Sequence, residues 1–329
     1  MRLADATVLV TGGAGFIGSH LVDALAGLGA RVRVLDDLST GKAANLDASR
    51  SSVEFLKADI RDARACAEAC AGAAVVFHQA ALGSVPRSIA DPVATIAVNV
   101  SGTANVFAAA RDTGVRRVVY ASSSSVYGDS AALPKREGDE GRPLSPYALS
   151  KCMNEELAEV FARCYGMEFV GLRYFNVYGP RQDPHGPYAA VIPRFFEASL
   201  KGEAVTIYGD GEQSRDFTFV SDAVAANLRA AEAPAKSCGV AYNVGGGERT
   251  TVNDLARLVS AVAGGTLAPR HEPPRPGDVV HSLADLTRAR AALGYLPRVG
   301  LAEGLERARA HYAASLTAVT ADPARKEAR

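Results

Sequence analysis

Short, nearly continuous hydrophobic runs alternate with stretches of helical character through the first half of the chain. We predict strands at residues 7–10, 31–35, 53–57, 74–78, 118–121 and 169–172, with helices at 16–28, 63–71 and 146–165. A long helix is expected to open at Asp91, an N-cap, with Pro92 in the first turn, where a missing N–H costs nothing. Strands without polar alternation are buried on both faces. The pattern therefore predicts an α/β fold, a doubly wound parallel sheet with helices on both faces.

The pattern changes after Asn176, where glycine, proline and tyrosine become frequent. Short strands and loops follow, with helices expected at residues 192–201, 220–231, 252–263 and 302–315. A chain of 329 residues is longer than one compact core usually holds. We therefore predict a first domain at 1–176 and a smaller C-terminal α/β lobe at 177–329, with 206–235 as a segment that could return to the first domain.

Charge and composition narrow the classes of function. Lys+Arg and Asp+Glu are both 36, so the formal net charge is zero, which argues against a nucleic-acid binder and a polybasic membrane anchor. The sequence has no apolar run approaching the roughly 18 residues of a membrane span, nor the apolar region of a signal peptide, so a cytoplasmic location is expected. The five cysteines form neither a disulfide framework nor a metal-binding pattern, and no metal is expected.

A glycine-rich turn joins the first predicted strand to the first helix. Gly12, Gly15 and Gly18 fit a phosphate-binding loop, in which backbone N–H groups at a helix N-terminus approach a pyrophosphate. Asp36 ends the second strand, at the distance expected for a carboxylate that binds adenosine ribose hydroxyls. A 2′-phosphate would be repelled there, so NAD is favoured over NADP. Asp59, beside Ile60, fits either an adenine contact or the N-cap of the next helix.

Tyr147 and Lys151 have the spacing Y-x-x-x-K, which places them one turn apart on a helix. An ammonium beside a phenol favours the phenolate, so Tyr147 is a candidate base for a hydroxyl proton. The run of serines at 122–125 directly follows a predicted strand, at the carboxyl edge where such sheets bind ligands. Glycine turn, serine run and dyad together predict a dehydrogenase-type site.

The sequence resembles the extended short-chain dehydrogenase/reductase family, which has a Rossmann fold. Within it, the sequence is similar to UDP-hexose 4-epimerases, and more closely to the UDP-N-acetylglucosamine 4-epimerases of bacterial polysaccharide pathways. The resemblance covers about residues 6–312 and is carried by 11–18, 78–81, 122–128, 146–151, 173–181, 209–211, 215–217 and 276–278. The narrower similarity is carried by 80–88, 181–184 and 188–193.

The resemblance implies a role for each matching residue. It makes Tyr147 the catalytic base, Lys151 its tuner and ribose ligand, and Ser123 the hydrogen-bond partner of the sugar O4. The implied NAD-binding residues are Gly12, Gly15, Phe16, Ile17, Gly18, Asp36, Asp59, Ile60, Gln79, Ala80, Ala81, Asn99, Tyr147, Lys151 and Tyr174. The implied UDP-sugar residues are Ser84, Ser123, Ser124, Ser125, Tyr147, Asn176, Ala190, Val191, Tyr208, Arg215, Arg275, Asp278 and Ser282.

The implied reaction is reversible C4 epimerisation of a UDP-sugar through a 4-keto sugar. Ser282 falls where the family has a gate beside the C2 substituent, and a small residue there leaves room for an N-acetyl group. UDP-GlcNAc and UDP-GalNAc are therefore the expected substrates. The alternatives are UDP-glucose and UDP-galactose, a UDP-uronic acid whose carboxylate meets Arg87 or Arg181, and an NAD-binding redox sensor without catalysis. The helices from Asp91 and Pro146 resemble the family's dimer contact, so a homodimer is expected.

Overall fold

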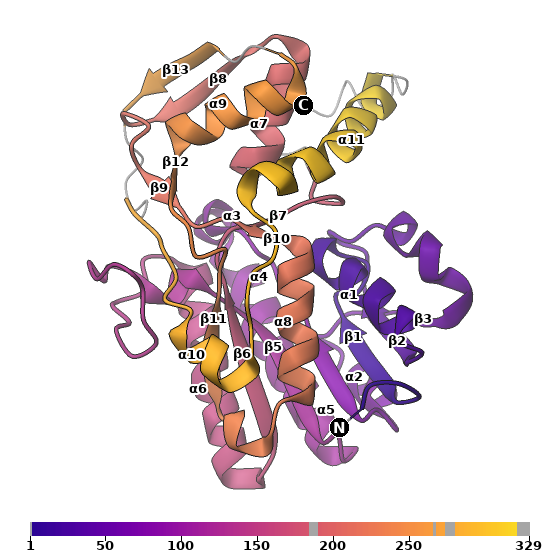
Figure 1. Cartoon of the computed structure of the whole chain (residues 1–329). Helices are drawn as coiled ribbons and strands as arrows, with labels where there is room; N and C mark the ends of the chain where they lie inside the picture. The colour runs from indigo at the N-terminus through magenta and orange to yellow at the C-terminus, as the bar shows by residue number, and fades with distance from the viewer. Residues whose placement is uncertain (1, 184–189, 266–267, 274–279, 321–329) are drawn as a thin grey trace.

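The computed structural model describes residues 2–183, 190–265, 268–273 and 280–320, with side chains described to residue 314. Its centre is a seven-stranded parallel sheet in the order β11-β6-β5-β4-β1-β2-β3 (Figure 1). The strands are β1 (Thr7–Thr11), β2 (Arg31–Asp36), β3 (Val53–Lys57), β4 (Val75–His78), β5 (Arg117–Ser123), β6 (Glu168–Tyr174) and β11 (Val240–Val244). The predicted doubly wound α/β fold is confirmed.

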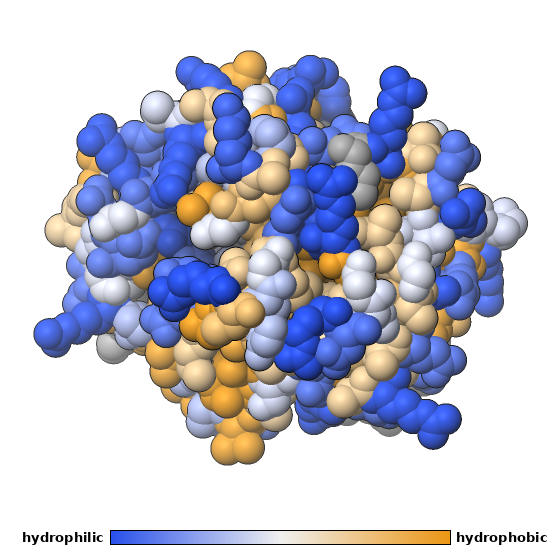
Figure 2. Space-filling view, turned by 90° about the horizontal axis from the view of Figure 1, so that it is seen from below, coloured by the Kyte–Doolittle hydropathy of each residue, from blue (hydrophilic) through white to orange (hydrophobic). Residues whose placement is uncertain are grey.

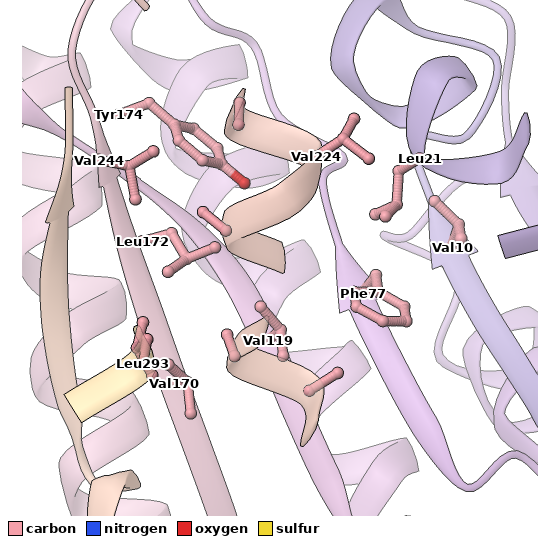
Figure 3. Close-up of a cluster of buried hydrophobic side chains, with 14 of the residues drawn as sticks. Val10, Leu21, Phe77, Val119, Val170, Leu172, Tyr174, Val224, Val244 and Leu293 are labelled. Carbon is pink, nitrogen blue, oxygen red and sulfur yellow. The ribbon is translucent and has the colours of Figure 1, made fainter. Parts of the chain in front are cut away.

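Alternating side chains of the strands build a separate hydrophobic layer on each face of the sheet. Val8 and Val10 face one layer and Leu9 the other, as strand geometry requires. The first layer packs against α1 (Phe16–Gly27), α8 (Val220–Glu232) and α10 (Thr287–Leu293), and Figure 3 shows its central residues between the strands and α8. The second packs against α2 (Ala63–Cys70), α5 (Thr103–Asp112) and α6 (Pro146–Tyr165).

The helix predicted at Asp91 is continuous from Pro92 to Asp112 but changes its winding. Asp91 is its N-cap and accepts a hydrogen bond from the Ala94 N–H, as predicted. Short α3 (Val85–Ala90) precedes it, and α4 (Pro92–Ile96) passes through a π-helical segment, Ala97–Gly102, into α5. By length and composition Pro92–Asp112 is also the one described stretch able to span a membrane, yet nearly half of it is buried inside the protein. A core helix of this kind meets the same test.

The smaller lobe has a core of its own and lies above the sheet in Figure 1. Phe195, Phe196, Leu255, Leu305 and Tyr312 meet in it. Its helices are α7 (Val191–Lys201), α9 (Val252–Ala263) and α11 (Leu301–Thr320), beside a parallel pair of β8 (Ala204–Tyr208) and β13 (Ala268–Glu272).

Two small strand pairs lie between the lobe and the sheet. Their strands are β7 (Val177–Tyr178) with β10 (Thr218–Phe219), and β9 (Ser214–Arg215) with β12 (Thr250–Thr251). From this region the chain runs back to the sheet as α8 and β11. The domain limits placed at residue 176 stay a prediction.

β5 is tied to α8 by a buried arginine at its first position. Arg117 is 2% exposed, donates to the carbonyls of Ala230, Ala231 and Ala233 at the end of α8, and is paired with Glu168 of β6. A cation at a helix C-terminus satisfies its last carbonyls. The outer face at this end of the molecule is a mosaic of hydrophilic and hydrophobic groups (Figure 2).

Candidate active site

The glycine turn needs its glycines for different reasons. Gly12 has a φ of +68°, and a Cβ there would lie 2.6 Å from the Ala80 amide nitrogen. A Cβ on Gly18 would collide with the Gly12 carbonyl, so Gly18 lets α1 pack against the turn. A Cβ on Gly15 would meet only the Gly12 carbonyl oxygen, at 3.1 Å. Because Gly15 lines a cavity, its missing side chain leaves free space at the cavity wall, next to the N-terminus of α1.

This cavity has a volume of about 470 Å³ and extends along the carboxyl edge of the sheet. At its first end lies the N-terminus of α1, which has no acidic residue in its first turn and no side-chain cap. Backbone N–H groups at such a helix start attract a phosphate group. The turn and helix therefore fit the pyrophosphate of a dinucleotide.

Asp36 stands beside this turn at the end of β2. Its carboxylate accepts hydrogen bonds from the N–H groups of Ala14 at 2.9 Å and Leu38 at 2.8 Å. Burial raises the pKa of the carboxyl, and these two N–H groups lower it. Its place in the cavity wall suits the ribose role predicted for it. The neighbours Asp37, Ser39 and Thr40 also line the cavity, although no motif in the sequence marks them.

Asp59 and Ile60 form the next part of the wall, after β3. Asp59 is paired with Arg61, whose hydrogen bonds hold the pKa of that carboxyl below its usual range. The N-cap of α2 is Asp62, which accepts from the Arg64 and Ala65 N–H groups. The alternative interpretation of Asp59 as that N-cap is therefore wrong.

Tyr147, Lys151 and Ser123 meet at the other part of the cavity. Ser145 caps α6 and Pro146 occupies its first turn, so the two dyad residues lie one turn apart near the start of the helix. Ser123 Oγ donates to Ser125 Oγ at 3.0 Å, and Lys151 Nζ donates to the Ala121 carbonyl at 2.8 Å. Ser123 and Lys151 are buried, whereas Tyr147 is partly exposed.

Burial dominates the charge state of the dyad. It raises the pKa of the Tyr147 phenol, while the hydrogen bond with Ser123 lowers it. Burial lowers the pKa of Lys151 to about 8, and the negative charge of Glu155 raises it. The expected lowering of the phenol pKa is therefore wrong for the protein chain by itself.

Six further residues predicted to bind the cofactor line the cavity, and one does not. Gln79, Ala80, Ala81 and Tyr174 are in the wall, as are Phe16 and Ile17. Asn99 is fully buried in the π-helical segment; it bonds both the N–H and the carbonyl of Leu82 and donates to Ser150 Oγ. It thus holds the loop at Leu82 and Gly83, which lines the cavity.

The residues predicted to bind substrate divide into two groups. Ser123, Ser124, Ser125, Tyr147 and Asn176 line the cavity. Asn176 has a φ of +31° and donates to the Asp216 carbonyl at 2.9 Å, where the chain leaves the sheet for the lobe. The residues outside its lining are Ser84, Ala190, Val191, Tyr208, Arg215 and Ser282, and Arg275 and Asp278 lie outside the described residues.

Three residues of the second group gather around the segment 213–215. Gln213 donates to the Tyr208 carbonyl, Arg215 donates to the Val280 carbonyl, and the Ser282 N–H donates to the Ser214 carbonyl. Ser282 is 6% exposed. Ser84 instead caps α3, accepting from the Arg87 N–H, while Ala190 and Val191 begin α7.

Comparison with known proteins shows the family to which the chain belongs. The model of the NAD dependent epimerase/dehydratase family matches residues 8–245. The chain is 45% identical to a UDP-glucose 4-epimerase of Mycolicibacterium smegmatis over 301 residues, 90% of this chain and 95% of that protein.

Two solved structures are similar over nearly the whole chain. One is a UDP-N-acetylglucosamine 4-epimerase of Methanobrevibacter ruminantium in complex with UDP-N-acetylmuramic acid, with TM-score 0.90, 39% identity, and 94% of this chain and 99% of that one covered. The other is a Thermus thermophilus UDP-glucose 4-epimerase in complex with NAD, with TM-score 0.85, 39% identity, and 93% and 99% covered.

The free space beside Gly15 in the cavity wall allows a direct test of dinucleotide binding. Gly15→Ala is expected to weaken NAD binding about tenfold or more, because its Cβ occupies ligand space, while the melting temperature changes little. Binding is measured by calorimetry on the protein freed of nucleotide. Gly27→Ala, on the same helix with open space around its Cβ, is the control and should bind NAD normally. Equal affinity of the two variants for NAD would show that the space beside Gly15 is not needed for NAD binding.

Proposed function

The chain belongs to the NAD dependent epimerase/dehydratase family, and from this premise we propose that it interconverts UDP-GlcNAc and UDP-GalNAc by inverting C4 of the sugar. It is an NAD-dependent nucleotide-sugar epimerase. The observation that carries the proposal is that Ser123, Tyr147 and Lys151 line one cavity together with the glycine turn.

The dyad supplies the acid–base chemistry of this reaction. Tyr147 takes the proton of the C4 hydroxyl and later returns it, and Ser123 holds the same oxygen by a hydrogen bond. The Lys151 ammonium favours the phenolate as the proton leaves. The chemistry that bound NAD would supply at this site is reversible hydride transfer at C4, so the overall reaction would consume no nicotinamide. The cavity wall at Gly12, Gly15, Asp36 and Gln79 would hold it.

The sugar must turn over between the two hydride transfers while the diphosphate stays in place. Hydroxyl groups at 123–125 offer few directional contacts to the sugar, which suits such a turn. Arginine binds phosphate oxygens in pairs, so Arg215 and Arg275 are proposed to bind the diphosphate, and together with Asn176 and Asp278 they are proposed to hold the uridine diphosphate as a whole. The names of the relatives support UDP-sugars as the substrate class.

The C2 substituent is the finer part of the proposal. Ser282 is small, which favours an N-acetyl group, and one similar structure is a UDP-N-acetylglucosamine 4-epimerase. The alternative substrates are UDP-glucose and UDP-galactose, favoured by the name of the Mycolicibacterium relative. A sensor without catalysis is disfavoured, because Tyr147 and Lys151 are both present and adjacent.

A homodimer is proposed as the assembly. Hydrophobic side chains are exposed on α3, α4 and α6, with Ile89 64%, Val93 78%, Leu149 44%, Met153 37% and Val160 41% exposed. Groups of exposed apolar residues mark interaction surfaces. Helices α4 and α6 belong to the pair, beginning at Asp91 and Pro146, that was expected from the sequence to form the contact.

Removing the phenolic oxygen tests the reaction. Tyr147→Phe is expected to lower kcat by about 10²–10⁴-fold, because the general acid–base is lost. Anomeric-proton NMR of the enzyme with UDP-GlcNAc, without added NAD, follows the interconversion. Tyr165→Phe makes the same change at the far end of α6 and should react like the wild type. Undiminished turnover in Tyr147→Phe would remove the dyad from the mechanism.

Enlarging Ser282 tests the substrate assignment. Ser282→Tyr is expected to lose turnover of UDP-GlcNAc but keep that of UDP-glucose, since forcing a bulky group into a filled site costs about 1–3 kcal/mol. Both substrates are compared by the same NMR assay, with Ser282→Ala as the small-residue control. Equal loss on both substrates contradicts the gate.

The mass in solution tests the dimer. Light scattering should give twice the chain mass of 34.3 kDa. Val93→Glu should shift the protein toward the monomer without lowering its melting temperature, because Val93 is 78% exposed in the single chain. A wild-type protein with the mass of one chain contradicts the assembly.

A further inference from the structure

Glu155 and Arg173 form a buried ion pair directly behind the dyad, and neither takes part in the mechanism above. Arg173 Nε donates to Glu155 Oε1 at 2.9 Å, and Arg173 Nη2 donates to Oε2 at 2.7 Å. The Arg173 side chain is 8% exposed and that of Glu155 17%. A two-pronged guanidinium–carboxylate contact fixes the orientation of both groups.

The pair is linked to the dyad through α6. Glu155 lies one turn beyond Lys151 and two turns beyond Tyr147, so the three side chains follow one face of the helix. Ser122 Oγ donates to Glu155 Oε1 at 2.5 Å, and Lys151 Nζ donates to the carbonyl of Ala121 at 2.8 Å. Helix α6 is therefore hydrogen-bonded to two successive residues of β5, Ala121 and Ser122, immediately before Ser123.

The pair is linked to the sheet as well. Ser122 of β5 and Arg173 of β6 are neighbours across the two strands. Arg173 also contacts Glu140 and, at 3.1 Å, the Tyr127 hydroxyl. A closed set of contacts thus joins two strands and the catalytic helix at the point where Ser123 leaves the sheet.

We propose that Glu155 and Arg173 are positioning residues of the epimerase site, which hold the end of β5 against α6 and keep a negative charge near the Lys151 ammonium. The inference rests on the proposed function, because it assigns a part in that reaction to residues that touch neither substrate nor cofactor.

The charged and titratable groups around Lys151 determine in which direction the loss of Glu155 should shift the Lys151 pKa. Burial and the charge of Lys151 lower the pKa of His78 on β4 to about 3, so His78 is neutral. Burial raises the pKa of the Tyr120 phenol on β5 and of Tyr147 on α6, so both are neutral in the chain itself. Glu155 is then the carboxylate that opposes the lowering of the Lys151 pKa by burial.

Removing the negative charge of Glu155 should therefore lower the pKa of Lys151, so that its ammonium loses the proton at lower pH. In the wild type the ammonium is lost as the pH rises through about 8, and activity should fall with it. Glu155→Gln keeps the shape of the side chain and an oxygen that can accept the Ser122 hydrogen bond. In this variant the fall in activity should begin at lower pH.

The experiment measures kcat and KM of the holoenzyme across this pH range, and titrates Lys151 directly by NMR of protein labelled with ¹³C-lysine, assigned with Lys151→Arg. For Glu155→Gln we expect kcat to fall about 10- to 100-fold with KM little changed, as for a small misplacement of catalytic groups. The Lys151 titration should shift to lower pH.

Glu168→Gln is the matched control, because it breaks the buried pair with Arg117 at the opposite end of β5 and β6. It should lower the melting temperature but leave kcat and the lysine titration unchanged. Ser122→Ala keeps the Glu155–Arg173 pair and removes only its bond to β5. This variant should lower kcat without shifting the titration, and it decides the positioning role if Glu155→Gln does not fold.

A folded Glu155→Gln protein with wild-type kcat and an unshifted titration overturns the proposal. So does an equal loss of kcat in Glu155→Gln and Glu168→Gln with no shift in either, since that outcome reports lost stability alone. If the wild type turns over no UDP-sugar, the proposed function fails instead, and the lysine titration still decides whether Glu155 acts on Lys151.

Discussion

Parallel pairing is the constraint on which the site depends. When strands run in the same direction, their carboxyl ends meet at one edge of the sheet, and the residues that follow them must lie together. The turn after β1, Asp36 after β2, Gln79 after β4 and Ser123 of β5 reach the same cavity in this way. Helix α6 adds its groups from the side, and its two bonds to the end of β5 bring Tyr147 and Lys151 to that edge.

The parts that sequence could predict are those in which neighbouring residues act together. The glycine turn, Asp36 at a strand end and the Tyr147–Lys151 pair are each recognised from a short stretch of sequence. All of these residues line the cavity. The position of Asn99 behind the cavity wall could not be predicted, because nothing in the neighbouring sequence indicates the π-helical segment that turns its side chain toward the Leu82 backbone. Strand β11 was missed because its pairing with β6 comes from a distant segment.

Charge states were the harder part, since they depend on burial rather than on spacing. The i, i+4 relation between Tyr147 and Lys151 predicts an ammonium beside a phenol, but not that the surrounding protein raises the pKa of the phenol and lowers that of the ammonium. Two buried arginines show the same limit. Nothing in the sequence marks Arg117 and Arg173 as buried, yet each is enclosed and paired with a glutamate, one at either end of the central strands.

The order of the strands also bears on how the chain is made. Strand β6 ends at Tyr174, but its outer neighbour β11 begins only at Val240. Until the ribosome has completed the segment between them, a nascent chain presents the hydrophobic edge of β6 unpaired, and such an edge can recruit a strand from another molecule. Biosynthesis thus has a vulnerable interval that ends when β11 emerges and closes the sheet.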